Sequence, residues 1–267
     1  MADSSDVLKG KRVLVTRPRE QASDFSERLT SLGMVPILFP TIDIVPMPNT
    51  TALDDAIRHL ASFDWVIFTS VNGVESFFKR FNTFGSGEAS MFSEQVVAIG
   101  PSTASTLHKY GVEPYGTPDE YIADRIPDLL GDVNDKNVLL PRAEIVREAL
   151  AKELLRRGAH VTEVAAYQTV AAQPTSNAWM ELHRGVDVLS FTSSSTVRFF
   201  LQLVRQDTQV RLGEALVACI GPITAQTARE QGLHVDVIAR QFTAEGLVQV
   251  ICELLIKQVD ERGKVHG

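Results

Sequence analysis

Short apolar runs alternate with longer amphipathic stretches along most of this chain. The clearest runs span residues 65–68, 96–99, 188–191 and 216–220, and they are almost continuously hydrophobic. Continuous apolar runs are typical of strands in a parallel sheet that is covered on both faces. Strands that alternate with helical patterns of about 10 to 15 residues predict right-handed βαβ units.

The first amphipathic helix of each series is predicted over residues 22–32 and 147–157. A glycine follows each of them, Gly33 in one case and Gly158 in the other. Glycine adopts the left-handed conformation that ends a helix without a steric penalty. Both helices are therefore expected to stop at these glycines.

The same series of elements occurs twice. Matched segments follow one another in the same order, and their first residues lie 125, 123 and 121 positions apart. A nearly constant offset of this kind indicates an internal duplication. The matched segments are 11–18 with 136–143, 63–73 with 186–196, and 97–104 with 218–225.

Two extended segments, 41–48 and 166–174, occupy equivalent places in the two halves and end at proline. If both connect domains, the chain crosses from the first domain to the second and returns. This predicts an α/β protein with two homologous domains, each a parallel sheet flanked by helices, in which the first domain is discontinuous and a two-stranded β linker joins them. The predicted boundaries are 1–40 with 175–267 for domain 1, 48–167 for domain 2, and 41–47 with 168–174 for the linker.

Four strand-to-helix turns are rich in glycine and hydroxyl residues: 69–73, 100–103, 192–196 and 221–224. Ligands of open parallel sheets bind beyond the carboxyl ends of the strands. Free backbone N–H groups at helix starts favour carboxylate or phosphate, although serine and threonine there also serve as simple N-caps. Two such turns from each half favour one anion-binding cleft between the halves.

An arginine closes the first strand of each half, Arg17 in one and Arg142 in the other. A guanidinium at the carboxyl end of a strand is well placed to hold a carboxylate. The alternative is a surface arginine that pairs with a nearby acid.

Composition narrows the function further. The 267 residues are 44% hydrophobic and 22% charged, as in globular proteins, and the net charge of −7 argues against a general nucleic-acid binder. Cys219 and Cys252 lie in apolar runs, which predicts buried free thiols and a reducing compartment. With no signal-like N-terminus and no membrane-spanning run, we expect a cytoplasmic protein that does not bind membranes.

Candidate catalytic chemistry is sparse. The six histidines share no metal-ligand spacing, and HExxH, GxSxG, P-loop and GxGxxG motifs do not occur. The sequence therefore argues against metal-dependent hydrolysis, acyl transfer and dinucleotide redox chemistry, and it favours the binding and orientation of a polyanion with at most a weak acid catalyst. Tyr167, on the second extended segment, is a candidate for that acid, although a tyrosine there can also serve packing alone.

These features together resemble the uroporphyrinogen-III synthase family over about residues 11–257. The resemblance depends on the order and spacing of several short motifs, none of which is decisive alone. They are 13–18, 68–74, 98–101 with Thr103, 140–142, 166–169, 191–193, 220–222, and Thr243 with the helix after it.

The resemblance implies a monomeric lyase of tetrapyrrole and haem biosynthesis that works without a cofactor. Such an enzyme cyclises hydroxymethylbilane, a linear tetrapyrrole polycarboxylate, to uroporphyrinogen III with loss of water and inversion of ring D. By position in the motifs, Tyr167 is the expected acid that assists departure of the hydroxyl group. The expected substrate-binding residues are Thr16, Arg17, Ser70, Thr103, Arg142, Ser193 and Thr224.

Two other interpretations remain open at this point, because duplicated α/β lobes serve several functions. One is a non-enzymatic two-lobed protein that binds or senses small anions. The other is a sugar-phosphate or nucleotide enzyme that uses the same helix starts.

Overall fold

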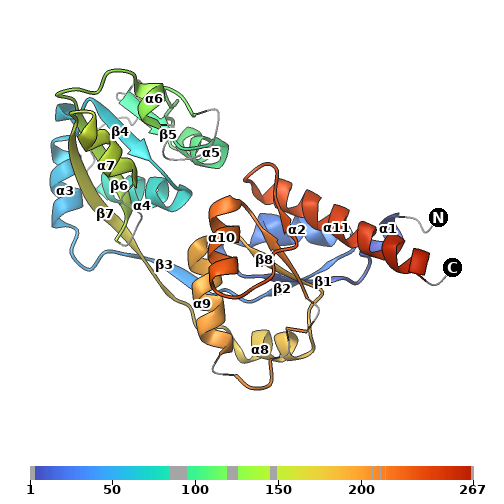
Figure 1. The fold of residues 1–267 in the computed structure, drawn as a ribbon. Coiled ribbons are helices and arrows are strands. Elements are labelled where there is room, and N and C mark those ends of the chain that lie inside the picture. The colour runs from blue at the N-terminus through green and yellow to red at the C-terminus, as the bar shows by residue number, and fades with distance from the viewer. Residues whose placement is uncertain are drawn as a thin grey trace. The chain divides into compact units, whose positions relative to one another are not determined.

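The computed structural model of the protein is shown in Figure 1. The chain divides into two compact units, unit 1 (Met1–Asp43 and Val170–Gly267) and unit 2 (Ile44–Thr169). Both division points fall within the segments that were expected to connect two domains, while the predicted boundaries themselves stay predictions. The structure describes residues 4–83, 95–118, 126–144, 149–205, 207–210, 212–213 and 215–265.

Unit 1 contains a five-stranded sheet in the order β10-β9-β8-β1-β2, and all its strand pairs are parallel. The central strand β1 pairs with β2 on one side and with β8, made more than 170 residues later, on the other. The strands are β1 (Arg12–Val15), β2 (Val35–Leu38), β8 (Val188–Phe191), β9 (Leu216–Cys219) and β10 (Val237–Ile238).

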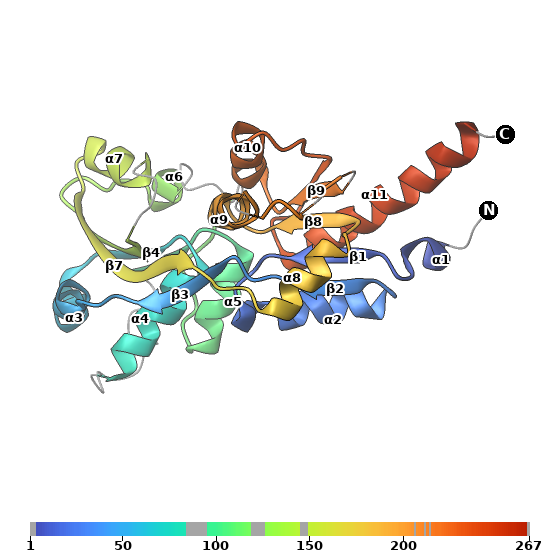
Figure 2. The ribbon, with the colours of Figure 1, turned by 90° about the horizontal axis from the view of Figure 1, so that it is seen from below.

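Helices cover both faces of this sheet (Figure 2). Val13 and Val15 pack in one apolar cluster with α2 and α11, while Leu14 packs in another with α8, α9 and α10. This alternation along β1 explains why the strand is apolar throughout. The helices of unit 1 are α1 (Ser4–Leu8), η1 (Arg19–Gln21), α2 (Ser23–Ser31), α8 (Ser176–His183), α9 (Ser194–Val204), α10 (Pro222–Glu230) and α11 (Ala244–Val265).

Unit 2 contains a second five-stranded sheet in the order β3-β7-β6-β4-β5. The pairs β4–β5, β4–β6 and β6–β7 are parallel. Strand β3 comes from the first extended segment, and the end of β7 comes from the second extended segment. The two strands are hydrogen-bonded neighbours in the sheet. The strands are β3 (Ile42–Pro46), β4 (Trp65–Phe68), β5 (Val96–Ala98), β6 (Asn137–Ala143) and β7 (His160–Ala171).

The faces of the second sheet are covered in the same way. Val66 and Phe68 of β4 pack with α3, α4 and α5, and Ile67 between them packs with α6 and α7. The prediction of parallel sheets flanked by helices is therefore confirmed. The helices of unit 2 are α3 (Thr51–Arg58), η2 (Leu60–Ser62), α4 (Val71–Thr83), α5 (Pro101–Lys109), α6 (Ile126–Leu130) and α7 (Ala149–Arg156).

The predicted helix ends are confirmed as well. Helices α2 and α7 end just before Gly33 and Gly158, whose φ angles are +81° and +88°. In both cases the N–H of the residue after the glycine donates to the carbonyl four positions before the glycine, at 3.1 Å. The two halves thus end their first helix with the same left-handed motif.

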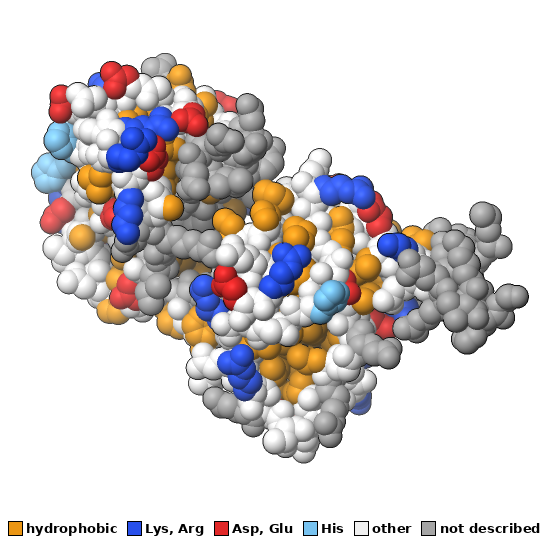
Figure 3. All heavy atoms as spheres, viewed as in Figure 1, with side chains coloured by type: hydrophobic (Ala, Val, Ile, Leu, Met, Phe, Trp, Pro, Cys, Tyr) orange, Lys and Arg blue, Asp and Glu red, His pale blue; other side chains and the backbone are white. Residues whose placement is uncertain are grey.

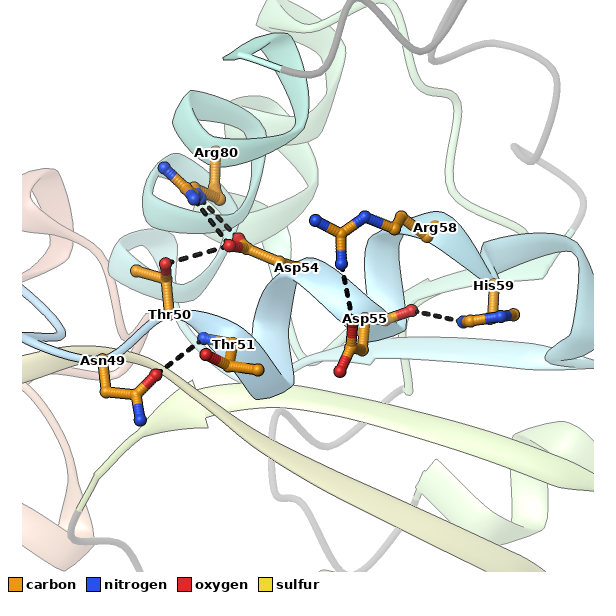
Figure 4. Close-up of polar contacts among 8 residues, drawn as sticks. All are labelled: Asn49, Thr50, Thr51, Asp54, Asp55, Arg58, His59 and Arg80. Atoms are coloured by element: carbon orange, nitrogen blue, oxygen red, sulfur yellow. Dashed lines mark hydrogen bonds and ion pairs between the residues drawn. The ribbon is translucent and has the colours of Figure 1, made fainter.

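An ion pair joins α3 to α4 in unit 2 (Figure 4). Nε and Nη2 of Arg80 donate to the two carboxylate oxygens of Asp54 at 2.5 and 2.6 Å, and the Thr50 hydroxyl donates to the same group at 3.0 Å. Only 11% of the Asp54 side chain is exposed. The Arg80 hydrogen bonds hold the pKa of Asp54 below its ordinary value.

The surface drawn in Figure 3 carries basic and acidic side chains interspersed with hydrophobic ones. Within the described part of the chain, no helix is both long and apolar enough to cross a bilayer.

Candidate functional site

Each unit brings its predicted site residues to the edge where its parallel strands end. In unit 1, Thr16 and Arg17 follow β1, and Ser193 and Thr224 lie just beyond the neighbouring strands β8 and β9. In unit 2, Ser70 follows β4 and Thr103 lies beyond β5, while Arg142 and Tyr167 lie near the ends of β6 and β7. Since carboxyl ends of parallel strands share one edge, each unit has its own candidate site.

Ser70 and Tyr167 are in direct contact in unit 2. Ser70 immediately precedes α4, and its Oγ accepts a hydrogen bond from the Gly73 N–H at 3.0 Å. The same Oγ lies 3.2 Å from the hydroxyl oxygen of Tyr167. Two residues that lie 97 positions apart thus form one polar pair at the start of α4.

Tyr167 packs its ring in the core of unit 2 and places its hydroxyl group beside Ser70. Tyr167 is only 6% exposed and packs in the apolar cluster that includes Phe68 and Phe77. The residue therefore has the packing role that was the alternative to a catalytic one, and this role does not prevent its hydroxyl group from reaching the edge of the sheet. Burial raises the pKa of the Tyr167 hydroxyl, whereas hydrogen bonds with Ser70 and Asn72 lower it. The phenol is therefore protonated at neutral pH and can act as an acid.

Asn72 is a site residue that sequence reasoning missed. It lies two residues after Ser70 in the turn over 69–73, which the sequence singled out, but nothing in the local pattern indicated a contact with Tyr167. The contact joins segments far apart in the chain, and only the fold brings them together.

The helix starts fall into two kinds. Ser193 caps α9, because its Oγ accepts from the Thr196 N–H at 3.1 Å while the Thr196 hydroxyl accepts from the Ser193 N–H at 3.2 Å. Helices α5 and α10 instead follow the N-cap residues Gly100 and Gly221, and no side chain of the described residues caps them. Their first N–H groups, at the positive end of the helix dipole, are suited to a carboxylate.

Thr103 and Thr224 are the third residues of α5 and α10, and their side chains are buried. Their backbone N–H groups belong to the unsatisfied first turn of each helix. The structure therefore places these two residues where the backbone, rather than the hydroxyl, is suited to an anion.

Thr16 is used inside the fold. It is completely buried, and its hydroxyl donates to the Ser190 carbonyl of β8 at 2.7 Å. The side chain links β1 to β8 and has no exposed surface. The structure thus gives Thr16 a packing role, and the prediction of a substrate contact gains no support from it.

The two equivalent arginines differ. Nε of Arg17 is buried and has no hydrogen-bond partner among the described residues. Burial lowers the pKa of the Arg17 guanidinium, and the charge of Asp24 raises it. Arg142 instead forms an ion pair with Glu163 on the neighbouring strand β7. It pairs with a nearby acid as the alternative expected, but it is not a surface arginine, because only 12% of its side chain is exposed.

The thiols are structural. Cys219 is a buried free thiol, as predicted, and burial raises its pKa to about 12. Cys252, on α11, is also free but only half-buried, because it packs at the margin of the unit 1 core. Thiols with raised pKa values are poor nucleophiles. In the described residues, no group of three or more His, Cys, Asp and Glu could hold a metal ion.

Comparison with known proteins adds to this geometry. The family model described as "Uroporphyrinogen-III synthase HemD" matches residues 23–249. The uroporphyrinogen-III synthase of Synechococcus elongatus is 33% identical over 255 residues, which cover 91% of this chain and 95% of that protein. The one from Chlorobaculum parvum is 29% identical, with 92% and 99% covered.

Solved structures share the fold. A mutant uroporphyrinogen III synthase from Thermus thermophilus matches with a TM-score of 0.64 and 22% identity, covering 93% of this chain and 100% of that one. A uroporphyrinogen-III synthetase from Helicobacter pylori matches with a TM-score of 0.60 and 20% identity, covering 92% and 99%. At these identities the similarity supports the α/β architecture alone.

Proposed function

The chain belongs to the uroporphyrinogen-III synthase family, and from this premise we propose that it cyclises hydroxymethylbilane to uroporphyrinogen III. The reaction loses water, closes the macrocycle and inverts ring D, which makes the protein a lyase. The proposal includes action without a metal or cofactor.

The observation that carries substrate binding is the buried Nε of Arg17, which has no hydrogen-bond partner among the described residues. A buried donor without a partner costs free energy, and native structures rarely leave one without a reason. The substrate has a carboxylate on each acetate and propionate side chain. One of these carboxylates would give the Arg17 Nε the acceptor that it lacks among the described residues.

Helix starts supply further donors. The uncapped starts of α5 and α10 offer N–H groups that include those of Thr103 and Thr224. Ser193 adds a helix start whose dipole favours negative charge. These donors bind carboxylates without the strongly basic composition that the net charge of −7 excludes.

Three of the predicted contacts change in this proposal. Ser70 Oγ is already bonded to the Gly73 N–H and the Tyr167 hydroxyl, so we do not assign it a direct contact with a carboxylate. Thr16 already donates to the Ser190 carbonyl, and Arg142 is already paired with Glu163. We therefore assign Thr16 and Arg142 to the support of the two edges, and we assign direct carboxylate binding to Arg17.

Tyr167 supplies the acid. When its O–H bond breaks, the proton passes to the hydroxyl group of the substrate, the C–O bond breaks, and water leaves. The electron-rich pyrrole stabilises the resulting azafulvene, so a weak acid suffices. The proton returns to Tyr167 when the ring carbon that forms the new bond loses its hydrogen.

Orientation decides the product. The activated carbon can react at either position of ring D, and inverted closure passes through a spiro-pyrrolenine intermediate. An enzyme that holds the carboxylates in fixed places can favour this route, because proximity and orientation lower the barrier without added chemistry.

The experiment is to incubate the protein with enzymatically generated hydroxymethylbilane and to separate the product isomers. Formation of the type III isomer above the type I isomer that arises spontaneously supports the proposal. Type I alone, with tight binding of the substrate, would instead favour the two-lobed binding or sensor protein.

The proposal extends to the setting of the enzyme. Its composition and its family favour a cytoplasmic monomer that binds neither nucleic acid nor membranes. Unchanged activity after dialysis against EDTA, and the mass of a monomer in sedimentation or light-scattering analysis, are the expected results.

A further inference from the structure

A bulge in β7 determines where Tyr167 points. Arg142 of β6 is level with Ala165, but the next residue, Ala143, is level with Tyr167, so Ala166 is an extra residue in β7. Neighbouring residues of a regular strand point to opposite faces. Ala166 and Tyr167 nevertheless both lie in the apolar cluster that packs against α4. The bulge therefore turns Tyr167 towards α4, as bulges do near functional sites.

The Tyr167 hydroxyl group lies beside Ser70, which already has one hydrogen-bond partner. Ser70 Oγ already accepts from the Gly73 N–H at 3.0 Å, and it lies 3.2 Å from the Tyr167 hydroxyl oxygen, where either hydroxyl group could be the donor. The Gly73 bond does not use the Ser70 proton, so that proton is available to the phenol oxygen. Both partners belong to unit 2. The N-terminus of α4, with its positive dipole end, lies directly behind the pair.

We propose that Ser70 is the positioning residue for the Tyr167 hydroxyl. The Ser70 hydroxyl donates a hydrogen bond to the phenol oxygen and keeps its proton. The proton of the phenol is then directed at the leaving hydroxyl group of the substrate. After that proton has moved, the same Ser70 hydrogen bond and the start of α4 stabilise the phenolate. The inference rests on the proposed function, in which Tyr167 gives up its proton.

The repeat provides the contrast. Ser193 occupies the place of Ser70 in the other half and also caps a helix, with its Oγ 3.1 Å from the Thr196 N. The residue that matches Tyr167, at the offset of 125, is Ile42, which has no hydroxyl group. Ser193 therefore caps a helix only, whereas Ser70 caps a helix and also bonds to the hydroxyl group of Tyr167.

Charged neighbours do not account for the behaviour of this phenol. Burial and the hydrogen bonds with Ser70 and Asn72 shift the pKa of Tyr167, and no charged group of the described residues contributes. Removal of the Ser70 hydroxyl should therefore act on Tyr167 directly. Four charged side chains lie nearest in sequence to this edge. They are Arg142 on β6, Glu144 just after β6, Glu163 on β7 and Glu75 on α4.

The first test measures the ionisation of Tyr167 in the full chain without substrate. Tyrosine labelled with 13C at Cζ gives one NMR signal per tyrosine, and Tyr167→Phe identifies the signal of interest. Ser70→Gly removes the hydroxyl group, while glycine still serves as an N-cap residue. We expect the Tyr167 signal to titrate at higher pH in Ser70→Gly and to return towards the wild-type position in Ser70→Thr.

Ser193→Gly is the matched control, because it removes the equivalent cap from the other half. It should leave the Tyr167 titration where it is. If Ser70→Gly and Ser193→Gly give the same Tyr167 titration as the wild type, the inference is overturned.

The second test measures turnover. In Ser70→Gly we expect kcat to fall about tenfold with KM nearly unchanged, since one hydrogen bond to the acid is lost. The alkaline limb of the kcat profile should move to higher pH, because a phenol with a raised pKa stays protonated longer. A shifted titration with unchanged kcat would overturn the positioning role.

The two proposals fail in different ways. A wild-type protein that forms no type III isomer overturns the proposed function, and the proton transfer with it. An active wild type whose Tyr167 titration ignores Ser70 overturns the positioning role alone.

Discussion

Replacing Arg17 by methionine separates substrate binding from stability. The guanidinium Nε makes no hydrogen bond with the described residues, so the substitution removes a buried donor that the fold leaves unsatisfied. Methionine keeps most of the length of the side chain. The free energy of unfolding should therefore fall by no more than about 0.5 kcal/mol. It can even rise, because the cost of burying the charge disappears.

The effect on the substrate should be much larger. A hydrogen bond to a charged group contributes about 1.5 to 3 kcal/mol, which corresponds to about 10- to 150-fold in affinity. We expect KM to rise by that factor in Arg17→Met while kcat changes less. Initial rates over a range of hydroxymethylbilane concentrations and urea unfolding of the same samples measure the two quantities.

Arg142→Met is the matched variant from the other half. It leaves the Glu163 carboxylate without its partner, and that carboxylate is partly exposed, with 37% of the side chain accessible. The expected loss of stability is about 1 to 2 kcal/mol, below the full cost of breaking a buried pair. Equal losses of stability in the two variants, or an unchanged KM in Arg17→Met, would refute the reasoning.

Three further predictions concern single groups. Tyr167→Phe should lower kcat about 100-fold and leave the circular dichroism spectrum intact, because it removes a proton donor but keeps the ring in the core; activity near that of the wild type would remove Tyr167 from the mechanism. Cys219, whose pKa burial raises to about 12, should resist iodoacetamide at pH 8 until the protein unfolds, and rapid alkylation of the native protein would contradict this. Asp54 has a pKa below its ordinary value because of Arg80, so the pair stabilises unit 2 above about pH 4 and loses this effect as the pH falls through the lowered pKa. Asp54→Asn should therefore lower stability at pH 7 and flatten its decline in acid, as followed by urea unfolding at a series of pH values.

Much of the fold could be predicted because the relevant signals are local. Apolar runs indicated the strands, and Gly33 and Gly158 indicated the ends of two helices because few other residues adopt a positive φ there. The duplication then allowed each half to support the interpretation of the other. The edge that carries the candidate site follows from parallel strands alone.

The finer chemistry depends on contacts between distant segments. Arg17 and Arg142 look equivalent in the sequence, but β7 brings Glu163 alongside β6 to pair with Arg142, while the Arg17 Nε has no partner among the described residues. The bulge at Ala166 has no sequence signature, yet it decides the face to which Tyr167 points. Local patterns carry no information about such partners, so they could not be predicted.

The order of synthesis has a consequence for the central strand of unit 1. Strand β1 emerges early but pairs with β8, which the ribosome supplies more than 170 residues later. All five strands of the unit 2 sheet are complete before β8 appears. The inserted unit can thus fold first, while the N-terminal segment waits with one edge of β1 unpaired. Chaperones that shield exposed strands during translation should therefore bind the first 40 or so residues rather than the middle of the chain.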